Sequence, residues 1–386
     1  MNQRFYALDV FRGATVALMI LVNNPGSWSH LYKPLAHANW HGCTPTDLVF
    51  PFFLFAVGNA MAFVLPRLQA AGQQAFLRKV LIRSLLIFGI GLFLNWFPFV
   101  KWTDSGLAFK HWVDPQHPEN GVRILGVLQR IALCYLFAAL ILYYWKPRGA
   151  WLAACIILLG YWALCFTLGN PADPYSLQGY FGNSVDQQLL GIPHLYKGEG
   201  VPFDPEGITS TLTGICQVVF GYFVGQYILQ KGKTYEMLSN LFVAAGLLLF
   251  TGLTWDLLFP INKKIWTSSY VLYTTGLAIM VLSTLLFLIE FKQVKGAWTR
   301  FFDVFGKNAL FIFMISALVP KGLSLVRFTD ASTGEGSNPL DWFYTHVCAP
   351  VSPDPRAGSF LFALCMILFY WLIVYWLDRK KIYIKV

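Results

Sequence analysis

FRGATVALMILVNNPGSWSH (residues 11–30) and PTDLVFPFFLFAVGNAMAFVL (residues 45–65) are two mostly apolar runs, and they flank the polar segment LYKPLAHANWHGCT (residues 31–44). A bilayer core roughly 30 Å thick requires about 20 apolar residues in each helical span. Both runs reach that length, and neither alternates between apolar and polar residues as a barrel strand does. This part of the chain therefore predicts two transmembrane helices joined by a polar connection.

The rest of the chain repeats the pattern. Apolar residues make up 56% of the 386 residues, charged residues make up 12%, and the mean hydropathy is +0.53. We expect an all-α polytopic membrane helix bundle that forms a single transmembrane domain over residues 1–386, with about ten spans. The predicted spans are 11–30, 45–65, 80–99, 123–144, 150–168, 208–229, 236–258, 266–289, 301–320 and 358–377.

The basic residues predict the orientation of these spans. With a cytoplasmic amino terminus, 18 of the 29 Lys and Arg residues fall in cytoplasmic segments, ten fall in the longer outer loops, and Arg130 lies within a span. This bias follows the positive-inside rule and places both termini in the cytoplasm. The net charge of +10 therefore reflects topology and contact with anionic lipid, and it gives no reason to expect nucleic-acid binding.

The seven cysteines show no CxxC or other metal-binding spacing, so we expect no metal site. Five of them lie inside predicted spans, where cysteine usually packs as a small apolar residue. Cys43 and Cys348 fall near the outer face, and the sequence leaves open whether they pair.

The polar connection carries the candidate chemistry. His30, His37 and His41 lie within twelve residues of one another, between Asn23 and Asp47. Histidine titrates near neutrality, as a general base at neutral pH must, and an asparagine amide can stabilise a developing oxyanion. A single interfacial histidine often has only a structural role, but three beside Asn23 and Asp47 favour a site.

Two features of this segment have ordinary explanations as well. Trp28, Tyr32 and Trp40 could stack on a sugar ring, but aromatic residues also gather at membrane interfaces. Asp47 could orient His37 or His41 and raise its basicity, or it could simply cap the helix that begins near Thr44.

An ordered set of motifs resembles the heparan-α-glucosaminide N-acetyltransferase family of transmembrane acyltransferases, specifically its short bacterial members. Each motif is weak alone, but together they cover nearly the whole chain. They are LDVFRG (8–13), VN (22–23), HANWHG (37–42), TDLVFP (46–51), RILGVLQRI (123–131), FDPEG (203–207), NKKIWTSSY (262–270) and GKNA (306–309).

The resemblance implies that the chain is an acetyl-CoA-dependent amino-sugar N-acetyltransferase. Acetyl-CoA would be used from the cytoplasmic side, and the acetyl group would reach the amine of a glucosamine-type sugar on the outer side. His37 would be the active-site histidine and Asn23 its essential amide partner. From its own position beside the histidines, we add Asp47 to the catalytic set as the carboxylate that would orient His37. The enzyme would lie in the bacterial inner membrane, with its active site towards the periplasm.

Further residues are candidates for binding the two substrates. Cations within or at the ends of spans are costly unless they are paired, so Arg12, Arg130 and Lys307 are candidate partners for CoA, with snorkelling or pairing to lipid and acids as the alternative. Candidate residues for the amino sugar are Trp40, His41, Asp186 and Glu206. For Glu206, capping of the span near residue 208 together with Asp204 is the alternative.

A multi-span transporter or flippase of a sugar or glycolipid is the rival class of protein. Transporters usually place their ionisable groups near the membrane midplane. Here the polar residues gather at one face, which favours the acyltransferase. The sequence leaves open which amino sugar is the acceptor, whether His37 itself is acetylated, and whether the protein is a homodimer.

Overall fold

The computed structural model describes residues 5–103, 106–330, 334 and 336–384. Regular structure in these residues is helical apart from two short antiparallel hairpins, which confirms the all-α fold class. The elements are α1 (Tyr6–Asn23), η1 (Lys33–Leu35), η2 (Pro45–Leu48), α2 (Val49–Ala70), α3 (Gln73–Trp96), β1 (Val100–Thr103), β2 (Gly106–Phe109), α4 (Val127–Tyr144), α5 (Lys146–Leu168), α6 (Phe181–Leu190), η3 (Ile192–His194), α7 (Ile208–Lys231), α8 (Tyr235–Asp256), α9 (Ser268–Leu286), η4 (Phe287–Phe291), α10 (Ala297–Lys307), α11 (Ala309–Leu323), β3 (Phe328–Thr329), β4 (Gly336–Ser337), α12 (Pro339–Phe343), η5 (Tyr344–Cys348), η6 (Ala349–Val351) and α13 (Pro355–Arg379).

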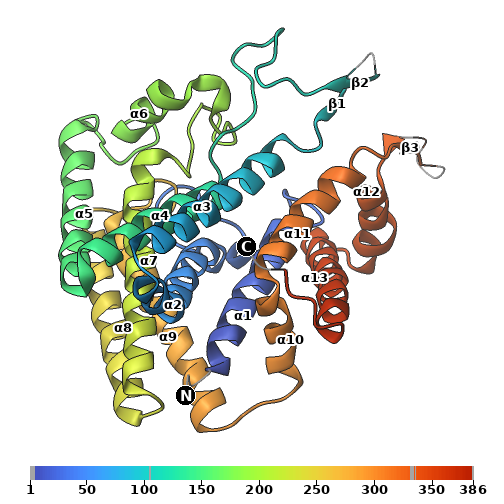
Figure 1. The fold of residues 1–386 in the computed structure, drawn as a ribbon. Helices are drawn as coiled ribbons and strands as arrows, with labels where there is room; N and C mark the ends of the chain where they lie inside the picture. Colours follow the sequence, from blue (N-terminus) through green and yellow to red (C-terminus); the bar gives the residue numbers. More distant parts are fainter. Residues whose placement is uncertain (1–4, 104–105, 331–333, 335, 385–386) are drawn as a thin grey trace.

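Five helix ends meet at one end of the bundle, which we call the cavity end. Helix α1 ends there, and α2, α4, α7 and α9 begin there, because residues at or next to those ends line one cavity. At the far end of the bundle, the Ala7 amide donates to Glu290, and Lys233 pairs with Glu290 at 2.5 Å. In Figure 1 the amino terminus lies at the bottom of the bundle, while α6 and the β1–β2 hairpin project at the top.

Eight helices in the described part of the chain are long and apolar enough to cross a membrane, or nine if one bent pair counts as a span. This confirms a polytopic membrane protein, but with fewer such helices than the ten predicted. The run predicted at 80–99 forms α3, which carries three basic residues in its first half and is not among the eight. Helix α3 nevertheless returns the chain to the cavity end, since Asn95 donates to the backbone oxygens of Arg123 and Leu125, just before α4.

The first span is displaced from the predicted 11–30. Helix α1 begins at Tyr6 and ends at Asn23. Proline disfavours the helical conformation of the residue before it, and Asn24, which precedes Pro25, adopts φ −129° and ψ 54°. Residues 24–30 therefore belong to the polar connection, and Asn23 is the last residue of α1.

The span predicted at 301–320 is not one straight helix. Helices α10 and α11 meet at an angle of 79°, and Asn308 lies at the break with φ −125° and ψ 36°. The Asn308 side chain donates to the backbone oxygen of Ile382 and accepts the amide of Ile384. The carboxyl-terminal tail thus supplies hydrogen bonds to the residue at which the helix breaks.

Small residues let the central helices approach closely. A Cβ atom added to Gly58 of α2 would lie 1.9 Å from the backbone oxygen of Val218, and one added to Gly221 of α7 would lie 2.2 Å from that of Phe55. Close backbone contact through small residues is typical of helix packing in membranes. The contact fixes α2 against α7, both of which begin at the cavity end.

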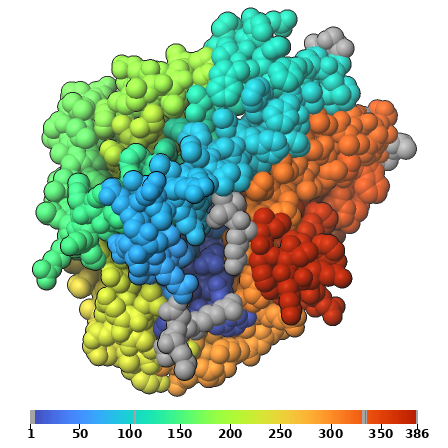
Figure 2. All heavy atoms as spheres, in the orientation of Figure 1, coloured from blue at the N-terminus to red at the C-terminus, as the bar shows by residue number. Residues whose placement is uncertain are grey.

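Helix α1 packs among other helices but can be seen at one face of the molecule. Figure 2 shows it in dark blue at the bottom of a recess between the sky-blue region where α2 meets α3 and the red end of α13. The Arg12 side chain on this helix keeps 31% of its surface exposed.

Candidate functional site

A cavity of about 280 Å³ lies at the cavity end of the bundle. Five of the ten residues that the sequence marks as candidates line it. These are Asn23, His37, Trp40, Asp47 and Glu206, and charged residues to which the sequence gave no role line it with them, namely Arg123, Glu199, Lys263 and Lys264. The structure thus brings together two candidates of the polar connection, one from each of the helices that flank it, and one from the loop before α7.

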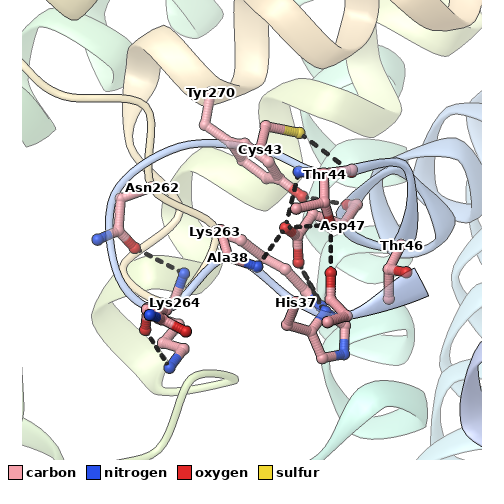
Figure 3. A network of polar contacts seen from close by, with 12 residues as sticks. His37, Ala38, Cys43, Thr44, Thr46, Asp47, Asn262, Lys263, Lys264 and Tyr270 are labelled. Atoms are coloured by element: carbon pink, nitrogen blue, oxygen red, sulfur yellow. Dashed lines mark hydrogen bonds and ion pairs between the residues drawn. The ribbon is translucent and has the colours of Figure 1, made fainter. Parts of the chain in front are cut away.

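His37 and Asp47 form the central pair of the site (Figure 3). His37 Nδ1 lies 2.7 Å from Asp47 Oδ1. A carboxylate only accepts hydrogen bonds, so Nδ1 carries the hydrogen of this bond in the neutral ring, and Nε2 remains as the nitrogen that can accept a proton. The His37 side chain is 43% exposed, whereas that of Asp47 is 1% exposed. A fixed, buried carboxylate therefore orients an accessible imidazole.

The local sequence explains why Asp47 is fixed. Thr44 and Asp47 form a capping box at the start of η2, with Pro45 in the first turn. Asp47 Oδ2 accepts hydrogen bonds from the Ala38 amide, the Thr44 amide and the Thr44 hydroxyl, each at 3.0 Å. Asp47 therefore both caps the helix and contacts the histidine, since one carboxylate oxygen accepts the capping hydrogen bonds and the other contacts His37.

Asn23 and Asn24 are adjacent but differ in their surroundings. Asn24 is buried, and its side chain donates to the Ile20 backbone oxygen at 3.0 Å. Asn23 is exposed to the cavity, and its side chain forms no hydrogen bond with another described residue. An amide group at the end of α1 is thus available to a molecule bound in the cavity.

Lys263 approaches the pair from the loop between α8 and α9. Its Nζ lies 3.1 Å from His37 Nδ1 and 3.4 Å from Asp47 Oδ1. Burial lowers the pKa of Lys263, and the nearby carboxylates of Asp47 and Glu206 act in the opposite direction. An ammonium, an imidazole and a carboxylate therefore meet at one point of the cavity wall.

Three ion pairs surround this centre. Arg123 contacts both Asp204 and Glu206, and Lys264 pairs with Glu199 at 2.6 Å. Burial alone would raise the pKa of Glu206, but Arg123 and Arg130 hold it below its ordinary value. The cavity therefore presents paired charges whose oxygen and nitrogen atoms suit a polar ligand.

The remaining candidates for sugar binding have other surroundings. The Trp40 indole lines the cavity and donates to the Tyr175 backbone oxygen at 2.8 Å. His41 is not among the residues that line this cavity; it lies 3.3 Å from the Asn262 amide, and burial lowers its pKa. Asp186 accepts the Ile208 amide at 2.8 Å. The sequence suggested that Asp204 and Glu206 cap the helix that begins near residue 208. In the structure the carboxylate that accepts the first amide of α7 belongs to Asp186.

The three candidates for binding CoA lie in two different places. Lys307 pairs with Asp303 at 2.7 Å and with Asp378 at 3.0 Å, and Arg12 lies 3.6 Å from Asp9. Arg130 is fully buried at the start of α4, where it lies over the Phe50 and Trp266 rings and donates to Gly207 and Ser210. Two of its nitrogens, Nε and Nη1, have no hydrogen-bond partner among the described residues. Arg130 therefore belongs to the surroundings of the cavity, since Phe50 also lines it.

One sequence signal could have marked the charged residues that were missed. Lys263 and Lys264 precede α9, and Arg123 precedes α4, at the ends that the charge bias assigns to the outer face. Basic residues are disfavoured there, so each is an exception that needs a local partner. Cys43 and Cys348 are both free cysteines, so they do not pair in this structure.

Comparison with known proteins agrees with the motifs. Residues 4–180 match the family model described as heparan-alpha-glucosaminide N-acetyltransferase, catalytic. Over 368 aligned residues, the chain is 28% identical to the Homo sapiens heparan-alpha-glucosaminide N-acetyltransferase and 27% identical to the Mus musculus protein of that name. Each alignment covers 81% of this chain but only 52% or 53% of the relative, so the chain spans about half the length of these relatives. The resemblance is confirmed: the chain is similar to the heparan-alpha-glucosaminide N-acetyltransferases and matches the pattern of their catalytic family over residues 4–180.

Proposed function

We propose that this chain is a transmembrane N-acetyltransferase that moves an acetyl group from acetyl-CoA to the amine of a glucosamine-type sugar. The observation that carries the proposal is the His37–Asp47 pair, which lies in a cavity also lined by Asn23, whose side chain forms no hydrogen bond with another described residue. The similarity to acetyltransferases supports the reaction class. The acceptor class follows from the names of those relatives.

The proposed reaction uses His37 as the general base. The amine nitrogen bonds to the thioester carbonyl carbon, and its proton passes to His37 Nε2. The carbon–sulfur bond then breaks, and the CoA thiolate takes up the proton. Asn23 would donate a hydrogen bond to the oxyanion of the tetrahedral intermediate, and Asp47 would hold the His37 ring in place. A route in which His37 first carries the acetyl group itself uses the same residues.

The proposed topology places the cavity towards the periplasm and both termini in the cytoplasm of a bacterial inner membrane. The bias of basic residues supports this topology. Helix α1 also begins, and α13 also ends, towards the far end of the bundle, where Lys307 of α10 pairs with Asp378 of α13. Acetyl-CoA would then approach from the far end. Its phosphates cannot enter hydrocarbon, so the pantetheine arm would have to extend between helices towards the cavity.

The candidate residues divide accordingly. Arg12 and Lys307 lie towards the far end and would contact the CoA phosphates. Arg130 lies beside the cavity, and two of its guanidinium nitrogens have no partner in the described part of the chain. These donors suit the carbonyl oxygens near the thioester rather than the phosphates. Glu206 and Trp40 would contact the sugar, through a carboxylate already turned towards Arg123 and an aromatic face that lines the cavity.

A transfer assay tests the proposal. The purified protein in liposomes is incubated with radiolabelled acetyl-CoA and separately with glucosamine, glucosamine-terminated oligosaccharides, or N-acetylglucosamine, which has no free amine. We expect label on the free amino sugars only, and none with His37→Ala, which should still bind CoA. Uptake of unmodified sugar into the liposomes without acetylation would instead identify a transporter.

A further inference from the structure

Lys263 is the charged residue closest to the His37–Asp47 pair, and neither the motifs nor the comparisons give it a role. It lies in the loop that joins α8 to α9, 226 residues from His37 in the sequence. Its ammonium is within 3.5 Å of both members of the pair, and its side chain is 21% exposed to the cavity. A lysine held so close to a histidine base must affect the charge of that base.

The hydrogen-bond donors and acceptors restrict how the three groups interact. Asp47 Oδ2 is occupied by its three bonds from Ala38 and Thr44, so only Oδ1 faces His37 and Lys263. When Nδ1 of neutral His37 donates to Oδ1, it cannot accept a hydrogen from the ammonium. Lys263 is then held by the Asp47 carboxylate and lies against the imidazole as an adjacent positive charge.

This arrangement balances two electrostatic effects on His37. An unpaired carboxylate at 2.7 Å would stabilise the protonated imidazolium, in which the ring can no longer accept a proton. A cation at 3.1 Å has the opposite effect, because it repels a second positive charge on the ring. With both present, the neutral ring, the carboxylate and the ammonium sum to zero charge.

We infer that Lys263 is a positioning residue that keeps His37 in its neutral, proton-accepting form by balancing the charge of Asp47. The inference rests on the proposed role of His37 as the base. It deepens that proposal by assigning the control of the protonation state of the base to a residue from a distant loop.

Other titratable groups around His37 do not supply this balance. Among the described residues that line the cavity, Arg123 pairs with Glu206 and Asp204, and Lys264 pairs with Glu199, so these charges offset one another. Burial raises the pKa of the Cys43 thiol to about 12 and lowers that of His41, so both groups are neutral at pH 7. The Tyr270 hydroxyl donates to the Asp47 backbone oxygen and carries no charge. Lys263 remains as the cation that faces the pair.

A direct titration of His37 tests the inference without any acetyl transfer. Of the two protonation states of histidine, only the neutral imidazole reacts with diethyl pyrocarbonate. Mass spectrometry of peptides resolves modification of His37 from that of His30, His41 and other nucleophilic side chains. The modification rate of the full chain in nanodiscs is measured from pH 5 to 9 for the wild type and for Lys263→Met, Lys263→Arg and Lys101→Met. Lys101 is the matched control, because it forms an exposed ion pair with Asp114 outside the cavity.

The expected result is a midpoint for His37 that rises by about one pH unit or more in Lys263→Met, or about tenfold in proton affinity. Lys263→Arg keeps the charge and should stay within a few tenths of a unit of the wild type, as should Lys101→Met. Lys263→Gln provides a second uncharged variant in case the methionine variant does not fold. An unchanged His37 midpoint in the uncharged variants overturns the inference.

The pH dependence of acetyl transfer separates this role from a structural one. Lys263→Met should lose most of its turnover below neutrality and regain it as the pH rises past the new midpoint. A loss by the same factor at every pH would mean that Lys263 only supports the loop, and would overturn the inference. If the wild type transfers no acetyl group at all, the proposed function fails, while the modification experiment still decides the effect of Lys263 on His37.

Discussion

Asp47 Oδ1 contacts His37 Nδ1 at 2.7 Å across ten residues of sequence, and the other oxygen of the same carboxylate caps the helix that begins at Pro45. The orientation of the proposed base is therefore tied to the start of a membrane helix. Because the capping oxygen is held by three hydrogen bonds, the contacting oxygen has little freedom to move away from His37.

Replacing this carboxylate should disable the base. In Asp47→Asn, the amide oxygen can keep the capping hydrogen bonds while the amide nitrogen faces His37, so Nδ1 must become the acceptor and Nε2 carries the hydrogen. We expect turnover of acetyl transfer to fall by about 10²–10⁴-fold with little change in the CoA dissociation constant. Asp114→Asn, in an exposed ion pair, is the control. Near-normal turnover in Asp47→Asn would remove Asp47 from the catalytic set.

Much of this site could be predicted because its parts are near one another in sequence. The His37–Asp47 contact joins the polar connection to the start of the next helix, only ten residues away, and Asn23 lies at the end of α1, just before the connection. The helical membrane fold followed from runs of apolar residues, whose lengths are set by the bilayer. These features depend on local composition and short spacing.

The features that were missed depend on long-range packing. Lys263 reaches His37 only because α9 begins beside α2, and Arg123 meets Glu206 only because α4 and α7 begin together. The break at Asn308 is stabilised by the tail at Ile382 and Ile384, which no local pattern reveals. A single sequence does not specify which helix ends will be neighbours.

The two adjacent asparagines at the end of α1 allow a matched test of the oxyanion donor. Asn23→Ala should lower turnover by about 10²–10³-fold, the usual cost of one missing oxyanion donor, with the melting temperature unchanged. Asn24→Ala should instead lower the melting temperature and leave turnover nearly unchanged, because Asn24 is buried and hydrogen-bonded to Ile20. Steady-state kinetics and thermal unfolding of both variants provide the measurement. Equal turnover in the two variants would contradict the role of Asn23.

The proposed CoA contacts predict a loss of donor affinity alone. Arg12→Ala and Lys307→Ala should each raise the dissociation constant for CoA by roughly tenfold or more, because each loses a charge-assisted hydrogen bond to a phosphate. The Michaelis constant for the sugar should not change. Lys231→Ala is the control, since Lys231 also pairs with an acidic residue, Glu236, but is exposed. Isothermal titration with CoA measures the effect. Unchanged affinity in both variants would exclude these residues from the donor site.

The topology can be tested with two exposed glutamates. Glu119 precedes α4 and has 56% of its side chain exposed, and Glu236 begins α8 with 63% exposed. In a cysteine-free background, Glu119→Cys should react with a membrane-impermeant maleimide from outside, and Glu236→Cys only after permeabilisation. The reverse pattern would invert the proposed orientation and would place the cavity on the cytoplasmic side.

The buried carboxyl of Asp186 predicts how stability depends on pH. Burial raises its pKa from 3.8 to about 7, assisted by Asp204. Between about pH 4 and pH 7, the folded state therefore holds the proton more often than the unfolded state, and stability falls as the pH rises through this window.

Asp186→Asn keeps an oxygen for the Ile208 amide but carries no charge, so it should not show this loss. Above pH 7 its free energy of unfolding should exceed that of the wild type by at most about 4 kcal/mol, and its melting temperature should be higher. The two proteins should converge near pH 4. Thermal unfolding in one detergent at pH 5, 6, 7 and 8 measures the difference. The exposed control Asp114→Asn should show no such gain, because Lys101 lowers the pKa of that carboxyl instead. Parallel curves for wild type and Asp186→Asn would mean that Asp186 is ionised throughout, and that its negative charge is compensated by a neighbouring cation.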